Sequence, residues 1–442
     1  MSSWKKVRFS EICDITRGGS PRPIQEYMAN DGVPWIKISD ATASNSRFIE
    51  KTKEYIKKSG ISKSREVFPG DLILSNSATP GIPKFMRIYA CIHDGWLLLR
   101  NFKGANKEFI YWLLLNERDK LIQQGNGSVF TNLKTDILKN HIVNIPDDIE
   151  EQKRIATILN NIQEKIELNT QINQTLEQIA QTIFKSWFID FDPVHAKANA
   201  LASGQTAEQA TQAAMAVISG KNTQELHRLQ TANLEQYQQL WEIAEAFPSG
   251  FDEEGVPWGW EERELSYLFE FLSGAQPPKS EHIYEEKEGY ERFIQNRDYS
   301  NDNHKTYIPI SKKNKRCTEK DILMDKYGEA GKVRYGIKGA YNVALAKIVP
   351  QKDNLREFLR SYFTQDKIRN YLSSSSMAST RNSLNSTTFT RMKVIVPNDF
   401  LLSTFDKLAN EKIDKILQIK QENIELSKLR DYLLPKLLSG EV

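Results

Sequence analysis

Three polar loops in the first half of the chain carry the residue types that contact nucleic acid, and matching loops follow in the second half. The loop "TRGGSPRP" places basic and hydroxyl side chains around glycines that let the backbone approach a phosphate. In the major groove, Arg pairs with guanine, and Asn or Gln pairs with adenine. We predict DNA contacts by Arg17, Ser20, Arg22, Asn76, Thr79, Lys84, Asn126, Ser128, Thr131, Asn132 and Lys134, and by Gln276, Lys279, Tyr327, Lys332, Arg334, Ser379, Thr380, Arg381 and Asn382. For any one of these residues the alternative is a polar turn; the recurrence of three loops favours a shared role.

Residues that could perform catalysis form no convincing set. In "PDDIEEQK", Asp147, Glu151 and Lys153 resemble a Mg²⁺-dependent nuclease site, but they crowd into a helix start, where acids favourably meet the helix dipole. The string "CIHDGW" could ligate a metal, yet no second ligand cluster accompanies it, so a core strand and turn is favoured. No phosphate-binding loop and no dinucleotide fingerprint follows a strand. We predict no catalytic residue and no metal site.

The loops belong to an internal repeat with an offset of about 250 residues. This offset pairs Asp71 of "PGDLIL" with Asp321 of "EKDILM", and Gly81 with Gly331. Nearer the start, a slightly different offset pairs Gly18 with Gly274. The two halves of the chain are therefore duplicates.

Each half ends in a long predicted helix. In the first, an apolar or Asn residue recurs every seven positions from Ile155 to Ile183, which is coiled-coil periodicity. An Asn in such a seam penalises slipped registers, although Asn169 and Asn173 could instead face solvent at the seam's edge. The first helix would span roughly 60 Å, and antiparallel packing would place the two heads at opposite ends. The predicted seam comprises Ile155, Ile162, Asn169, Asn173, Leu176 and Ile183, with Phe405, Ile416, Asn423, Leu426 and Leu433.

Apart from the two long helices, the chain consists of two heads and one segment that connects the two repeats. The heads mix short strand-like runs bounded by Gly, Pro and Asn with one amphipathic helix pattern each, so the fold class is α+β. The Ala- and Gln-rich segment between the repeats is interpreted as a helical connector that carries the chain back along the long helices. The predicted domains are a first head at 1–148, a helix at 149–190, the connector at 191–257, a second head at 258–397 and a helix at 398–442.

Composition and charge limit the setting. With 442 residues, 39% of them hydrophobic, the chain can form two or three globular domains, and its net charge of +3 permits nucleic-acid binding through local patches only. Cys13, Cys91 and Cys317 lie far apart without metal-site spacing, so we expect buried thiols. No apolar stretch resembles a signal peptide or a membrane span, and a cytoplasmic protein is expected.

The segment 150–194, with "LLPKLLSGE" at the C-terminus, resembles the conserved regions of the specificity subunit of Type I restriction-modification systems. "GGSPRP", "PWIKISD" and "PGDLILSNSATPGIPKF" resemble its target-recognition domains. Two departures stand out: Pro146-Asp147-Asp148 replaces a Leu-Pro-Pro-Leu type stretch, and the second helix lacks the Glu-Gln pair of Glu151 and Gln152.

The resemblance implies that each head reads one half of a bipartite DNA sequence while the helices fix the gap. It also implies two methyltransferase subunits and, for cleavage, two motor-nuclease subunits as partners; S-adenosylmethionine, ATP and Mg²⁺ would be bound by those partners and none by this chain. The alternative is a coiled-coil scaffold whose heads bind proteins or glycans. The scaffold would show no salt-dependent DNA affinity, and it leaves unexplained why the heads differ while the helices stay alike.

Overall fold

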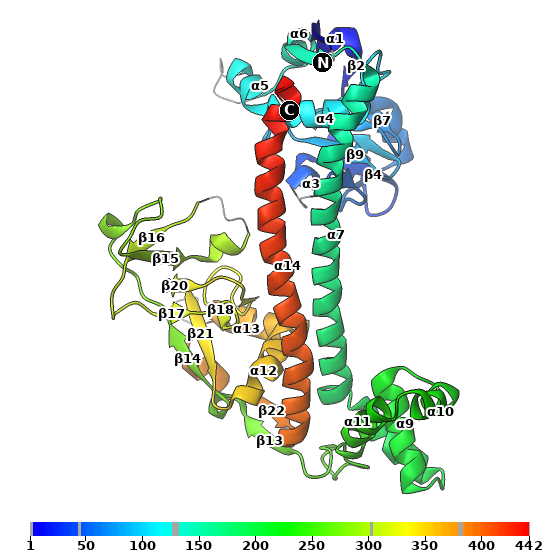
Figure 1. Ribbon diagram of the computed structural model, residues 1–442, viewed down its shortest axis with the longest axis vertical. Helices are drawn as coiled ribbons and strands as arrows, with labels where there is room; N and C mark the ends of the chain where they lie inside the picture. The colour runs from blue at the N-terminus through cyan, green and yellow to red at the C-terminus, as the bar shows by residue number, and fades with distance from the viewer. Residues whose placement is uncertain (1–2, 43–45, 126–131, 301–303, 379–382, 442) are drawn as a thin grey trace. The chain divides into compact units, whose positions relative to one another are not determined.

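The structure is a computed structural model that describes residues 3–42, 46–125, 132–300, 304–378 and 383–441 (Figure 1). The chain divides into two compact units, one made of Met1–Thr170 with Gln421–Val442 and the other of Gln171–Lys420. Each unit contains one head and a part of both long helices, α7 (Ile149–Phe188) and α14 (Asp399–Ser439).

The first head is built on two five-stranded sheets, with strand orders β3-β6-β4-β10-β7 and β2-β11-β8-β9-β5. A separate antiparallel pair of β1 and β12 joins the first strand to the last, with Trp4 opposite Pro146, so the head closes just before α7 begins. The strands are β1 (Trp4–Arg8), β2 (Asp14–Arg17), β3 (Met28–Ala29), β4 (Val33–Ile36), β5 (Phe48–Ile49), β6 (Tyr55–Ile56), β7 (Arg65–Val67), β8 (Leu72–Ser75), β9 (Pro83–Met86), β10 (Ala90–Ile92), β11 (Trp96–Arg100) and β12 (Ile142–Pro146).

The core of this head lies between the β2-β11-β8-β9-β5 sheet and the helix α4 (Lys107–Asn116). The residues Trp96 to Leu99 of β11 are apolar on both faces because Leu97 and Leu99 face this core, while Trp96 and Leu98 lie in a second buried cluster. Helix α4 begins where the Asn106 side chain accepts a hydrogen bond of 2.9 Å from the Phe109 amide. The remaining helices are α1 (Phe9–Ile12), α2 (Ile24–Tyr27), α3 (Ile38–Thr42), η1 (Lys58–Lys63), α5 (Arg118–Gly125) and α6 (Thr135–Asn140).

The second head repeats this topology with sheets ordered β14-β21-β18-β19 and β16-β15-β20-β17 and the pair β13-β22. Strand β21 pairs with β14 and β18 as β11 pairs with β2 and β8, and β20 runs parallel to β15 as β10 does to β4. The predicted duplication is therefore confirmed in the strand pairing. The strands are β13 (Glu261–Glu264), β14 (Phe269–Ser273), β15 (Tyr290–Ile294), β16 (Tyr307–Pro309), β17 (Arg316–Cys317), β18 (Ile322–Asp325), β19 (Val333–Arg334), β20 (Gly339–Tyr341), β21 (Leu345–Pro350) and β22 (Lys393–Val396).

Helices of the second head follow the same plan. Helix α12 packs Phe358, Leu359 and Phe363 into the core, as α4 does in the first head. The helices are η2 (Leu265–Tyr267), η3 (Lys279–Glu281), η4 (Asn296–Tyr299), η5 (Asp353–Leu355), α12 (Arg356–Thr364), α13 (Asp366–Ala378) and η6 (Ser386–Phe389).

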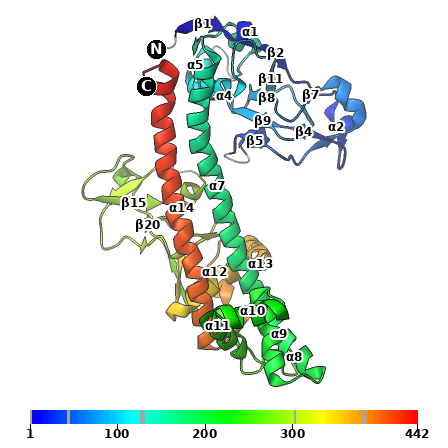
Figure 2. The same cartoon turned by 45° about the vertical axis from the view of Figure 1, so that its right-hand side comes forward.

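Within each unit α7 and α14 lie side by side (Figures 1 and 2). In the first unit they run antiparallel, because Asn169 contacts Asn423 and Gln163, nearer the start of α7, contacts Arg430, farther along α14. In the second unit the Phe184 and Phe405 rings lie 5.8 Å apart. Of the predicted seam, Ile155, Asn169, Asn173, Phe405 and Ile416 are buried, and Ile162, Leu176, Ile183, Asn423, Leu426 and Leu433 are half-buried.

The connector does not run back along the long helices, and that prediction is wrong. Trp187 at the end of α7 meets Phe247 with ring centroids 5.3 Å apart, and Phe188 meets Trp260 at 6.0 Å. The connector therefore leaves α7 and returns to the same aromatic cluster. Its helices are α8 (Asp192–Ala202), α9 (Ala207–Ser219), α10 (Thr223–Ala232) and α11 (Leu234–Glu245). The last three pack together around Met215, and α8 packs on α9.

Candidate nucleic-acid interface

Asp94, in the turn after β10, is the point at which four of the predicted contact residues of the first head meet. Nε of Arg17 donates a hydrogen bond of 2.8 Å to the Asp94 carbonyl, and Nδ2 of Asn76 donates to the same oxygen at 3.3 Å. Oγ of Ser20 donates to the carboxylate Oδ1 at 2.5 Å. A guanidinium nitrogen of Arg22 lies 3.8 Å from Oδ2. The structure thus joins the first two predicted loops through one acidic residue.

These arginines are held in place but not sequestered. Their side chains are 60% exposed for Arg17 and 75% for Arg22, and that of Asp94 is 42% exposed. Ion pairs this exposed are weak, so a phosphate or a base edge can compete for both guanidinium groups. Burial would raise the pKa of Asp94, but the Ser20 hydrogen bond, a backbone hydrogen bond and the charges of His93 and Arg17 outweigh it, and the pKa is lowered. The carboxylate is therefore charged at neutral pH and orients the arginines.

In each head, a glycine at the start of the first loop lets the chain pass close to a neighbouring turn. This turn follows β10 in the first head and β20 in the second. A Cβ on Gly18 would lie 2.1 Å from the carbonyl oxygen of His93, and one on Gly274 would lie 2.0 Å from that of Asn342. Any side chain there would push the loop away from its neighbour. The pairing of these two glycines in the sequence has this steric cause in both heads.

The third loop is fixed to the second by the same backbone hydrogen bond in both heads. The Leu133 amide donates to the Asn76 carbonyl at 2.8 Å, and the Leu384 amide donates to the Lys326 carbonyl at 3.2 Å. Asn76 and Lys326 are 250 residues apart, which is the repeat offset. In each head, the described end of the third loop therefore meets the second loop at an equivalent position.

The side chains on this shared frame differ between the heads. In the second head Nζ of Lys326 donates to Oγ of Ser273 at 2.9 Å, where the first head has the Asn76 amide. Gly18 approaches the His93 carbonyl as Gly274 approaches that of Asn342, so the residue equivalent to Asp94 is Val343, and the second head lacks the carboxylate that gathers the arginines. The same backbone positions hence present different charges and hydrogen-bonding groups.

Three predicted contacts are buried, and this placement corrects their expected role. Lys84 is 5% exposed, and its ammonium donates to the Ser46 carbonyl; burial, partly offset by the charge of Glu167, lowers its pKa to about 8. Arg334, at the equivalent position, is 9% exposed and donates to Oδ2 of Asp325 at 2.7 Å. Both basic side chains lie on strands, β9 and β19, and point into their heads. They therefore support the loops and do not present a charge to DNA. Asn76 is likewise 5% exposed and acts within the Asp94 cluster.

The other predicted residues are distributed as follows. Lys332 is paired with Glu329 at 2.7 Å, Thr79 is half-buried, and Tyr327 is 38% exposed. The exposed ones are Asn132, Lys134, Gln276 and Lys279. Outside the described residues lie Asn126, Ser128, Thr131, Ser379, Thr380, Arg381 and Asn382.

Asp94 and Lys326 were absent from the predicted contact set. The repeat offset aligns Lys326 with Asn76 and was a usable signal for the lysine. The sequence holds no comparable signal for Asp94, because its partners Arg17 and Arg22 lie more than 70 positions away and its structural equivalent in the second head is Val343.

The acids that resembled a nuclease site do not converge in the structure. Asp147 accepts a hydrogen bond from Ser3 at 2.6 Å, and Glu151 binds Arg154 at 2.8 Å. Lys153 binds Glu150 at 2.7 Å. Across the described ranges, no group of three or more His, Cys, Asp or Glu residues is arranged to hold a metal ion.

Two further expectations concern the cysteines and the membrane. The three thiols are free and buried, as expected. In the described part of the chain, no helix has both the length and the apolar composition needed to cross a bilayer.

The chain matches the family model of the Type I restriction modification DNA specificity domain over residues 1–178 and 257–430. It is 33% identical over 474 residues to the Type I restriction enzyme HindI specificity subunit of Haemophilus influenzae, covering 100% of both chains. The chain belongs to this family. A second relative is the Type I restriction enzyme MjaIX specificity subunit of Methanocaldococcus jannaschii, which is 26% identical over 458 residues, covering 99% of this chain and 93% of the relative.

The fold of this specificity subunit is also that of a solved relative. A crystal structure of the S subunit of a Type I restriction-modification system from M. genitalium aligns with a TM-score of 0.53 at 15% identity, covering 99% of this chain and 96% of that one. Membership of the specificity family makes the chain a DNA-recognition subunit without its own catalytic site. The family match omits residues 179–256, which are the end of α7 and the connector.

Proposed function

We propose that each head of this specificity subunit reads one half of a bipartite duplex DNA target. The observation that supports this function is one backbone frame with two side-chain sets: Gly18 and Gly274 make the same close approach, while Asn76 is replaced by Lys326. Two heads that share a loop backbone but carry different side chains suit a DNA target with two different halves.

In the first head, Arg17 and Arg22 are the proposed base or phosphate contacts, and Asp94 is the residue that orients them. In the second head, exposed Gln276, Lys279 and Tyr327 take the equivalent place. The buried basic side chains of Lys84 and Arg334 support the loops and do not contact DNA. The scaffold alternative has no specific observation in its favour.

We further propose that the paired helices α7 and α14 set the number of base pairs between the two half-sites and dock two methyltransferase subunits, with two motor-nuclease subunits joining for cleavage. S-adenosylmethionine, ATP and Mg²⁺ would then be bound by those partners in the cytoplasm. Isothermal titration of this chain alone with S-adenosylmethionine should give no heat of binding, and a measurable affinity would contradict the assignment.

The test of the function is to map methylated adenines by single-molecule sequencing in cells that express this chain with its methyltransferase partner. We expect one motif with two specific halves and a fixed gap. The variant Arg22→Ala should lower methylation by weakening one half of that motif, whereas Lys84→Met should leave the motif unchanged. A continuous motif, or none, would overturn the proposal. The scaffold alternative would also require that duplex affinity be independent of salt.

A further inference from the structure

A cavity of about 640 Å³ opens in the second head where two neighbouring strands diverge. Strands β15 and β20 pair only through Phe293 with Ala340 and Ile294 with Tyr341. Before that point β15 pairs on its other edge with β16, with Arg292 opposite Tyr307, and these two strands form one wall of the cavity. The segment leading into β20 lies on the other wall. The volume falls in the range of small-ligand sites, about 300–1,000 Å³.

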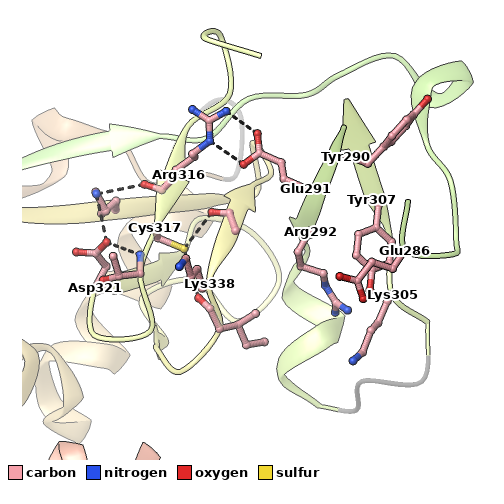
Figure 3. Close-up of a pocket in the computed structure, with 14 residues that line it drawn as sticks. Glu286, Tyr290, Glu291, Arg292, Lys305, Tyr307, Arg316, Cys317, Asp321 and Lys338 are labelled. Atoms are coloured by element: carbon pink, nitrogen blue, oxygen red, sulfur yellow. Dashed lines mark hydrogen bonds and ion pairs between the residues drawn. The ribbon is translucent and has the colours of Figure 1, made fainter. Parts of the chain in front are cut away.

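The floor and the rim of the cavity are fixed. At the floor, a Cβ on Gly339 would lie 2.5 Å from the Arg292 carbonyl oxygen, so the two walls touch there and no larger residue would fit. At the rim, Arg316 makes two hydrogen bonds of 2.7 Å to the Glu291 carboxylate and joins the walls (Figure 3). The cavity is therefore formed before any ligand arrives.

The charges that line the cavity are unequally compensated. Arg316 is paired with Glu291, and Lys347 lies 3.3 Å from Asp321. Among the described residues, Lys338 has no ion-pair partner, and it is exposed on the wall that leads into β20. Arg292 lies 3.1 Å from Asp298, so its charge is also compensated. The ammonium of Lys338 therefore favours an anion on that wall.

The opposite wall offers an aromatic surface. Tyr290 and Tyr307, both half-buried, line it from β15 and β16. The Tyr307 ring lies beside Glu286, whereas the Tyr290 ring points away from them (Figure 3). Tyrosine rings stack on nucleic-acid bases whatever their sequence. Glu286, next to Tyr307 in Figure 3, supplies a carboxylate that can accept a hydrogen bond from an exocyclic amino group.

We propose that this cavity binds a single unstacked nucleotide, with its phosphate at Lys338, its base against Tyr307, and its amino group at Glu286. The nucleotide can be a free mononucleotide or one nucleotide of a single strand. This inference goes beyond reading of a duplex and does not rest on it, because none of these residues belongs to the three predicted contact loops.

The test uses the full chain and calorimetric titration with AMP, adenosine, inorganic phosphate and a short single-stranded adenine oligonucleotide. AMP should bind more tightly than adenosine or phosphate, since only AMP carries both recognised groups. The variant Lys338→Ala should weaken AMP binding about tenfold, the loss typical of one charge-assisted hydrogen bond. Lys312→Ala, an exposed lysine of the same head that does not line the cavity, should bind as the wild type does.

The outcomes separate the two sources of the nucleotide. Binding of AMP that depends on Lys338 identifies a free mononucleotide as a ligand, and Lys338-dependent binding of the oligonucleotide alone identifies a strand. If neither probe binds, or if Lys312→Ala weakens binding as much as Lys338→Ala, the proposal is overturned. A second variant, Glu286→Gln, should reduce the preference for AMP over IMP, which lacks the amino group. Duplex binding measured in parallel reports separately on the proposed function.

Discussion

Nδ2 of Asn169 in α7 donates a hydrogen bond of 2.9 Å to Oδ1 of Asn423 in α14. The same Nδ2 lies 3.0 Å from the carboxylate of Glu422, and Asn423 in turn donates to the Ile166 carbonyl at 3.4 Å. Asn169 is only 1% exposed, so of the two positions open from sequence alone, the seam interior is the one observed. This buried polar contact ties one register of the helix pair to a satisfied set of hydrogen bonds.

The first prediction concerns this pair. Asn169→Leu leaves the Asn423 acceptor without its donor and should lower the free energy of unfolding by about 1–3 kcal/mol. The double variant Asn169→Leu with Asn423→Leu removes both polar groups and should be within about 1 kcal/mol of the wild type. Chemical denaturation of the four proteins in a double-mutant cycle measures the coupling.

Asn173 is the matched control for that cycle. It is 8% exposed, and its Oδ1 has no hydrogen-bond partner within the described residues. Asn173→Leu should therefore cost less than Asn169→Leu, or stabilise the chain. Equal losses at the two positions, or no coupling between Asn169 and Asn423, would show that the polar pair does not specify the register.

The second prediction follows from the buried ammonium of Lys84. Its pKa is lowered to about 8 from 10.5, so between these values the unfolded chain binds more protons and the folded state gains stability as pH rises. Relative to Lys84→Met, the wild type should gain up to about 3 kcal/mol in the free energy of unfolding between pH 8 and 10.5. Urea denaturation of both proteins across this pH range separates the contribution of Lys84 from those of the other titrating groups.

The same variant tests the corrected role of Lys84. Because the ammonium is buried, Lys84→Met should keep the wild-type duplex affinity and salt dependence at pH 7, whereas Arg22→Ala should lose affinity. A reduced salt slope for Lys84→Met would restore the phosphate-contact interpretation.

The third prediction concerns Asp94, which orients Arg17 and Arg22. Asp94→Asn removes the negative charge at little cost in shape, so non-specific duplex affinity should rise a few-fold. The freed arginines should discriminate less well, and the preference for the correct first half-site should fall about tenfold or more. Competition binding with targets mutated in one half at a time measures both effects.

The matched control is Asp31→Asn, which removes an exposed acid of the same head outside the cluster. It should leave discrimination unchanged. If Asp94→Asn altered the second half-site as much as the first, the assignment of the cluster to one head would fail.

The fourth prediction concerns spacing. The long helices divide between the two units after Thr170 in α7 and after Lys420 in α14. Four residues inserted at both points would lengthen the pair by about 6 Å at 1.5 Å per residue, and the preferred spacer should widen by one or two base pairs at about 3.4 Å each. The measurement is methylation of a target library whose spacers differ by single base pairs. A two-residue insertion rotates the seam by about 200° and should prevent assembly instead.

Much of the fold could be predicted from the sequence, because its signals are periodic or repeated. The seven-residue spacing from Ile155 to Ile183 located α7, and the repeat offset located the equivalent loops. The course of the connector could not be predicted, since helical periodicity says nothing about direction. Its path depends on contacts such as that of Trp187 with Phe247, which lie 60 positions apart.

The contact residues were harder to predict than the loops that hold them. A lysine in a polar loop looks the same in sequence whether it faces solvent, like Lys134, or a carbonyl inside the head, like Lys84. Burial of the latter follows from its place on β9, between β8 and β5, which only the assembled sheet defines. The role of Asp94 likewise arises from partners that are distant in sequence.

Above all, we propose that the two heads read separate halves of one target. The most direct test replaces residues 1–148 with the first head of a relative that has a different target, and maps the methylated motif of the hybrid with its methyltransferase partner. We predict that one half of the motif changes to that of the donor, while the other half and the spacer stay the same. A hybrid that assembles and methylates but changes both halves, or neither, would contradict it.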